Sequence, residues 1–330
     1  MKAADLTRLI HSRVFSVGVV LLVLGASAYF VAGGFATPIL GDKGLLFTSP
    51  SSWIPGMWQD YCVALLATGA IIIGMDMLCK IHNVLRSMSS LYLTLFMMME
   101  IASPDLFVQL YSGQLLALVV VVALLLIMNC FKNPGAPPFV FTVFLLLSGF
   151  ASTQYCSIFY IPAFLLICAQ MRVFNGKVLM AALLGLITPW WIIVGGGFLL
   201  GLVAPESLHL PDIHSIFAEI SVDDTVLILI TVGVTVLLSL SSFILNVLKT
   251  IAYNARSRAV NGAIILTWLT TLIAMCADYR NMIAYIPTLN VLSAINVTHY
   301  FATHRAERSF VAVLIVMAVY TGLYLCQILL

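Results

Sequence analysis

The chain has 330 residues, of which 62% are hydrophobic and 8% charged, with a mean hydropathy of +1.11 and a formal net charge of +2. A soluble domain carries about 25% charged residues, so this composition excludes a soluble domain and predicts a membrane protein. The small net charge gives no reason to expect nucleic acid as a partner. We expect one integral membrane domain over residues 1–330, folded as an all-α polytopic helical bundle.

About eleven apolar stretches follow one another along the chain, and a helix needs about 20 apolar residues to cross ~30 Å of hydrocarbon. The predicted spans cover approximately residues 14–34, 57–79, 89–103, 109–130, the two arms of a hairpin at 139–171, 178–203, 225–247, 260–277, 282–300 and 309–329. The first stretch exceeds the usual length of a signal peptide and is expected to be retained. The hairpin arms are short, which is typical either of helices in a thinned membrane or of re-entrant segments lining a cavity.

Proline and glycine predict a defect in the seventh of these spans. Thr188-Pro189-Trp190-Trp191 is followed closely by three consecutive glycines at 195–197. Proline kinks a helix and glycine weakens it, so this span is expected to be bent or broken.

The distribution of basic residues predicts the orientation. When the spans are threaded in turn through a bilayer, all but two of the 15 Lys and Arg residues fall on one side. These are Lys2, Arg8, Arg13, Lys80, Arg86, Lys132, Arg172, Lys177, Lys249, Arg256, Arg258, Arg305 and Arg308. Basic residues near helix ends remain cytoplasmic. We therefore expect eleven crossings with the N-terminus inside and the C-terminus outside.

Two acidic residues lie within predicted spans, where ionisable groups are costly and tend to be functional or paired. Asp76 precedes Lys80 by four residues, which places both on one helical face and predicts a local ion pair. Glu100 lies near the outer end of the third span. We expect it either to extend to the outer interface or to point into an outward-facing cavity.

The predicted outer side also carries the candidate site residues. The catalytic candidates are Asp42, Asp60, Glu100 and Asp278, and the substrate-binding candidates are Arg280, Tyr279 and Gln154. A carboxylate can act as general base on an acceptor hydroxyl. Arg280 opposes the charge bias of the chain, and either it pairs with Asp278 or it anchors an anionic head group or phosphate. We expect it to face an outward cavity that Asp60, Glu100 or Gln154 also reaches.

Other polar positions point to structural roles. The outer loop at 204–224 holds His209 and His214, but these lack the i, i+4 spacing and a third ligand, so no metal site is expected. No nucleotide-binding or nucleophile motif is present in the sequence, and no cofactor is expected. The tenth span carries Thr288, Asn290, Ser293 and Asn296. Such residues commonly hold membrane helices together through hydrogen bonds.

Several segments together resemble a known family. They are NVLRSMSSLYLTLFMMMEIASP and SGFASTQYCSIFYIPAFLLICAQMRVF within residues 83–174, the following NGKVLMAALLGLITPWWIIVGGGFLLG, Tyr253-Asn254-Ala255-Arg256, and Ile286-Pro287. In these features the chain resembles a family of multi-pass inner-membrane proteins of Bacteroidota whose activity is unknown. The resemblance implies a bacterial inner membrane with the outer side in the periplasm. It supplies no catalytic residues.

Three functions are compatible with this sequence. The first is handling of lipid-linked glycans at the outer leaflet, as in GT-C glycosyltransferases and O-antigen polymerases and ligases, with membrane lipid and a polyprenyl-phosphate-linked substrate as partners. Asp42, however, is unpaired in the first outer loop, where GT-C enzymes usually show two acids, and the loop at 204–224 contains no arginine. The second is a transporter or flippase, built from broken helices around a midplane site. The third is a non-catalytic subunit of an envelope complex.

Overall fold

The computed structural model describes residues 12–39, 50, 53–85, 90–133, 135–196, 199, 225–250, 254–303 and 306–329. Within these residues the chain is helical and contains no strand. The α-helices are α2 (Arg13–Ala32), α3 (Met57–Ile81), α4 (Leu91–Ile101), α5 (Pro104–Val108), α6 (Ser112–Met128), α7 (Ala136–Ala151), α8 (Tyr160–Gln170), α9 (Gly176–Trp190), α12 (Thr225–Thr250), α13 (Ala255–Ala277), α14 (Ile286–Thr303) and α15 (Ala306–Leu329). Three further helical turns are η2 (Tyr155–Phe159), η3 (Trp191–Gly196) and η5 (Tyr279–Tyr285).

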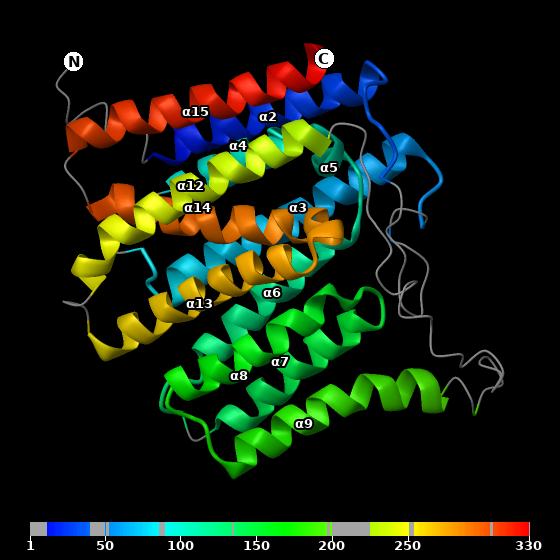
Figure 1. The fold of residues 1–330 in the computed structure, drawn as a ribbon, viewed down its shortest axis with the longest axis vertical. Coiled ribbons are helices and arrows are strands. Elements are labelled where there is room, and N and C mark those ends of the chain that lie inside the picture. The colour runs from blue at the N-terminus through cyan, green and yellow to red at the C-terminus, as the bar shows by residue number, and fades with distance from the viewer. Residues whose placement is uncertain are drawn as a thin grey trace.

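The helices pack side by side with their long axes roughly parallel, and their ends gather at the two ends of a bundle (Figure 1). The end of α2, the start of α12, the η5 turn and the C-terminal end of α15 all lie at the right-hand end of the view. These are the ends that the threading predicts to be outer. The first and last described helices are neighbours: Tyr324 on α15 donates a hydrogen bond of 2.8 Å to the carbonyl of Ala26 on α2.

Six helices in the described part of the chain are long and apolar enough to cross a membrane. They cover Arg13–Ala32, Met57–Ile81, Gly176–Gly196, Val226–Leu245, Ala255–Ala277 and Phe310–Leu329. Four apolar helices are shorter, namely Leu91–Ile101, Ser112–Met128, Ala136–Ala151 and Tyr155–Gln170. The protein is thus helical with the character of a membrane protein. The count of eleven crossings and the orientation stay predictions.

Two irregularities predicted from the sequence, a hairpin and an interrupted helix, are present in the structure. The hairpin expected at 139–171 consists of α7, η2 and α8, and Ser157 in η2 donates a hydrogen bond of 2.8 Å to the carbonyl of Leu147. In the seventh predicted span, α-helical hydrogen bonding ends at Trp190, directly after Pro189, and continues as the π-helical turn η3. A proline removes one backbone donor from the ladder, which favours such a local change.

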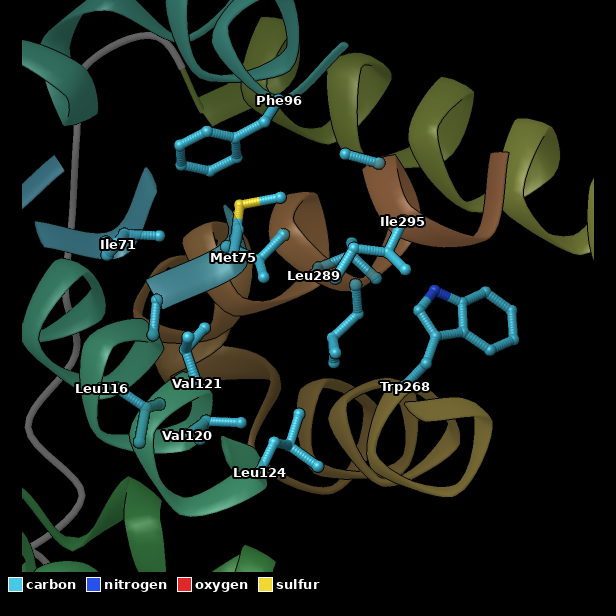
Figure 2. Close-up of a cluster of buried hydrophobic side chains, with 14 of the residues drawn as sticks. Ile71, Met75, Phe96, Leu116, Val120, Val121, Leu124, Trp268, Leu289 and Ile295 are labelled. Atoms are coloured by element: carbon cyan, nitrogen blue, oxygen red, sulfur yellow. The ribbon is translucent and has the colours of Figure 1, made fainter. Parts of the chain in front are cut away.

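Helices α4 and α14 occupy the interior of the bundle. Every residue of α4 except Leu93 is buried, and so is nearly all of α14. Ile71 and Met75 of α3, Phe96 of α4, Trp268 of α13 and Leu289 of α14 belong to one apolar cluster (Figure 2). With 11 residues, α4 is only about 16 Å long. A helix that is enclosed by others need not match the thickness of the hydrocarbon.

The predicted orientation can be tested with reporter fusions. A reporter that is active only in the periplasm should be active when it is fused after Leu330 and inactive when it is fused at Gly135. The basic residues beside the predicted inner loops are the reason, because they resist translocation. The reversed result at either fusion point would contradict the threading and the side assigned to each site residue.

Candidate functional site

A broken helix positions the most unusual acidic residue of the described chain. Helix α4 ends at Ile101, and α5 begins at Pro104 after Ser103, whose backbone is not helical (φ −127°, ψ 74°). Proline disfavours helical geometry in the residue that precedes it, which explains the break. The carbonyl of Glu100 accepts a hydrogen bond of 3.1 Å from the Ser103 amide. Glu100 therefore lies in the last turn of α4, directly before the break.

The Glu100 side chain points into the interior of the bundle. It is 4% exposed, and its Oε1 accepts a hydrogen bond of 3.0 Å from Nδ2 of Asn290 on α14, a residue that is also buried. The expectation that Glu100 extends to the outer interface is therefore wrong. The hydrophobic environment of α4 and α14 surrounds the pair, because nearly every neighbouring residue along both helices is buried and most are apolar. This pair joins residues that are 190 positions apart in sequence.

Three features disfavour a bare negative charge on Glu100. The carboxylate is removed from water, its hydrogen-bond donor is a neutral amide, and it lies at the C-terminal end of α4, where the helix dipole is negative. Glu100 also has no ion-pair partner among the described residues. The ion pair found among them joins Lys80 and Asp76 at 2.5 Å, as the sequence predicts. Binding of a proton or a cation at Glu100 would relieve this cost.

Two buried acids at the predicted outer end hold backbone segments in place instead. Oδ1 of Asp60, in the first turn of α3, accepts a hydrogen bond of 3.0 Å from the Leu110 amide between α5 and α6. Oδ1 of Asp105 accepts bonds from the amide and hydroxyl of Thr37 at 2.7 and 2.9 Å. Both carboxylates satisfy donors of non-helical backbone, so each has an evident structural role. Asp42 lies outside the described residues, as does the loop at 204–224.

Asp278 anchors a separate buried cluster, which we call the Asp278 cluster: Asp278, Tyr155, Asn281 and Tyr285. The hydroxyls of Tyr155 and Tyr285 donate to Oδ2 of Asp278 at 2.7 and 3.1 Å. Nδ2 of Asn281 donates to Oδ1 of Asp278 at 3.0 Å and also to the Tyr155 hydroxyl. The cluster ties η5, between α13 and α14, to η2, between α7 and α8.

The substrate-binding candidates do not share one environment. Tyr279 is 65% exposed and Arg280 is exposed beside it, with Nε 3.3 Å from the Tyr279 hydroxyl and the guanidinium 5.8 Å from the ring centre. Asp278 directly precedes them but turns inward. Gln154 is buried and precedes Tyr155 of the Asp278 cluster. Arg280 therefore lies on the surface, whereas Glu100 and Gln154 lie in the interior.

The sequence did not predict the hydrogen-bond partners of Glu100 and Asp278. It assigned Asn290 and Ser293 a role in helix contacts, which is confirmed for both, since Trp268 Nε1 donates to Ser293 Oγ at 3.1 Å. It did not link Asn290 to Glu100. The sequence did place Gln154, which precedes Tyr155, and Arg280, which precedes Asn281, on the same predicted outer side. That shared side is the signal that could have brought Tyr155 and Asn281 together.

The chain was compared with protein-family models, with curated proteins and with solved structures. No family model matches, and neither a curated protein nor a solved structure matches the chain.

Proposed function

We propose that the protein is a transporter of the bacterial inner membrane in which Glu100 binds and releases a proton. The observation that carries this proposal is the buried pair of Glu100 and Asn290, at the point where α4 gives way to α5. Membrane transporters commonly build their ion and substrate sites from discontinuous helices near the midplane. The six helices that are long and apolar enough to cross a membrane support a membrane location.

The surroundings of Glu100 suit a reversible proton site. A buried carboxyl with one neutral partner is stabilised by protonation, and an isolated buried charge is destabilised. A change in the packing of α4 against α14 would alter access of water to the carboxyl and hence its occupancy by a proton. Ligands shift a two-state equilibrium by binding its two states with different affinity. Proton binding at Glu100 would thereby favour one arrangement of these helices.

The buried acids with structural roles serve as a comparison. Asp60 and Asp105 accept hydrogen bonds from backbone amides, so truncation of either should disturb local backbone, whereas asparagine keeps an oxygen acceptor at the same place. The Glu100 carboxyl accepts a hydrogen bond from the side chain of Asn290 on a neighbouring helix, and among the described residues it binds no loop backbone. A glutamine at this position can still accept the bond from Asn290. The acidity of Glu100 can therefore be removed with little change in its shape.

Infrared spectroscopy of the reconstituted protein tests the proton site. Spectra recorded at acid and alkaline pH should differ by a carbonyl stretching band of a protonated carboxyl, and Glu100→Gln should lack this band. Asp60→Asn is the matched control, because it removes another buried carboxyl and should retain the band. If Glu100→Gln folds and its difference spectrum equals that of the wild type, Glu100 is not the proton site.

A second candidate function rests on Arg280. This residue is exposed beside Tyr279 at the predicted outer end, where a guanidinium and a phenol could bind the phosphate of a lipid-linked glycan. The comparison between the two functions uses complementation of a deletion strain. Transport predicts that Glu100→Gln fails to complement and Arg280→Ala succeeds. Glycan handling in the cell envelope predicts the opposite result, with accumulation of lipid-linked precursors in the strain that carries Arg280→Ala.

A further inference from the structure

The Asp278 cluster shares no hydrogen-bond partner with Glu100 among the described residues and lies at the turns of two helical hairpins. Tyr155 belongs to η2, and Asn281 and Tyr285 belong to η5. Both turns lie at the same end of the bundle, between α7 and α8 and between α13 and α14 (Figure 1). All four side chains are buried, with Asp278 5% and Asn281 0% exposed. The cluster is therefore a polar site enclosed by protein.

The cluster has an excess of negative charge. Asp278 contributes a carboxylate, and its three donors, the two phenols and the amide, are neutral. Asp278 also directly follows Ala277, the last residue of α13, where the helix dipole places a partial negative charge. In the described part of the chain, no lysine or arginine lies within 4.0 Å of this carboxylate. A bound positive charge would offset both the charge of the carboxylate and the negative end of the helix dipole.

One hydrogen-bond acceptor of the cluster has no donor among the described residues. Oδ1 of Asn281 is buried and has no hydrogen-bond partner among the described residues. Leaving a buried acceptor unsatisfied costs about 1–3 kcal/mol, so such atoms in folded proteins usually meet a bound water, ion or ligand. The Nδ2 atom of the same amide contacts Asp278 and Tyr155, which places the unsatisfied oxygen beside the cluster.

We propose that the Asp278 cluster binds a monovalent metal cation, for which sodium is the probe. The available ligands are hard oxygens: the Asp278 carboxylate, Oδ1 of Asn281 and the hydroxyls of Tyr155 and Tyr285, which can rotate their hydrogens away. Carbonyls at helix ends and in irregular turns coordinate sodium in membrane transporters. Asp278 lies between the C-terminal end of α13 and the η5 turn.

The charge and the spacing of the cluster select the class of ligand. A single carboxylate neutralises one positive charge, and the described residues contain no group of three His, Cys, Asp or Glu side chains that could hold a metal ion. A divalent ion would leave a buried positive charge. The two phenols and the amide stand within 3.1 Å of the carboxylate. Such close packing fits an ion better than an organic ammonium compound.

Thermal unfolding of the purified protein tests the sodium site without requiring a transport assay. The melting temperature Tm should rise with each increase in NaCl, whereas choline chloride at the same ionic strength should have no such effect. A ligand that binds the folded state alone stabilises it in proportion to the logarithm of its concentration above Kd. Asp278→Asn should abolish the sodium-dependent rise, and Asn281→Leu should shift it to higher sodium concentration. The matched control Asp60→Asn should keep it.

The outcomes separate this site from the proton site. Glu100→Gln should retain the sodium-dependent rise in Tm, whether or not Glu100 proves to bind a proton. If folded wild-type protein melts at the same temperature in NaCl and in choline chloride, the cluster holds water alone and the proposal is wrong. The same conclusion follows if both Asn281→Leu and Asp278→Asn respond to sodium as the wild type does. Asn281→Leu provides the test if Asp278→Asn fails to fold.

Discussion

Replacing Trp268 with alanine should reduce the stability of the bundle by about 3–5 kcal/mol, the range typical of buried aromatic residues truncated to alanine. Trp268 on α13 is fully buried, and its indole belongs to the apolar cluster shared with α3, α4, α6 and α14 (Figure 2). Its Nε1 donates a hydrogen bond of 3.1 Å to Ser293 Oγ on α14. Truncation therefore removes packing and also the donor to Ser293.

Thermal melting in lipid nanodiscs would measure this effect. Trp191→Ala is the matched control, because Trp191 in η3 is 75% exposed and its replacement should change stability by no more than about 0.5 kcal/mol. Trp268→Phe should fall between the two, since it keeps much of the ring packing but loses the indole donor. Equal melting temperatures for Trp268→Ala and Trp191→Ala would contradict the central position of α13.

The boundaries of most helices could be predicted because hydropathy follows the chain locally. Residues 260–277 were predicted as a span and form most of α13, and residues 57–79 form most of α3. The enclosure of α4 and α14 could not be predicted in this way. The sequence of an apolar helix has the same pattern whether lipid or other helices surround it. Asn290 and Ser293 of α14 have their hydrogen-bond partners on α4 and α13.

In the candidate site, the sequence identified single residues but not their hydrogen-bond partners. The cost of a membrane-embedded acid identified Glu100, but its partner Asn290 depends on the packing of two helices far apart in sequence. Asp278 and Arg280 are two residues apart and were expected to act together. The η5 turn instead directs Asp278 to Tyr155 and leaves Arg280 exposed. Turn geometry, which the sequence pattern does not specify, decides which side chain is buried.

Three described acids at the predicted outer end share a structural use. Asp60 binds the chain between α5 and α6, Asp105 binds the segment after α2, and Asp278 binds η2. Each compensates polar groups where regular helices end and backbone or side-chain donors lack intrahelical partners. The charge bias of the chain therefore reflects more than membrane orientation. It also supplies acceptors where the bundle needs them.

Replacing Gly185 with alanine should destabilise the protein, whereas the same change at Gly149 should not. A Cβ atom at Gly185 on α9 would lie 2.5 Å from the carbonyl oxygen of Phe141 and 3.0 Å from Cβ of Phe144, both on α7. Neither obstacle is a flexible side-chain end, so the two helices would have to separate. Ser148 on α7 also donates a hydrogen bond of 2.6 Å to the Leu186 carbonyl, which separation would lengthen. Overpacking of this kind costs about 1–3 kcal/mol.

Gly149 on α7 is the matched control for this contact, because it faces the same partner helix. Its added Cβ would meet Pro189 at 3.9 Å, an ordinary van der Waals distance. Alanine is favoured over glycine within a helix by about 1 kcal/mol, so Gly149→Ala should melt at or above the temperature of the wild type while Gly185→Ala melts below it. The two substitutions add the same methyl group to the same helix pair, so the opposite signs isolate the close approach at Gly185. A Gly185→Ala variant as stable as Gly149→Ala would show that α7 and α9 do not pack this closely.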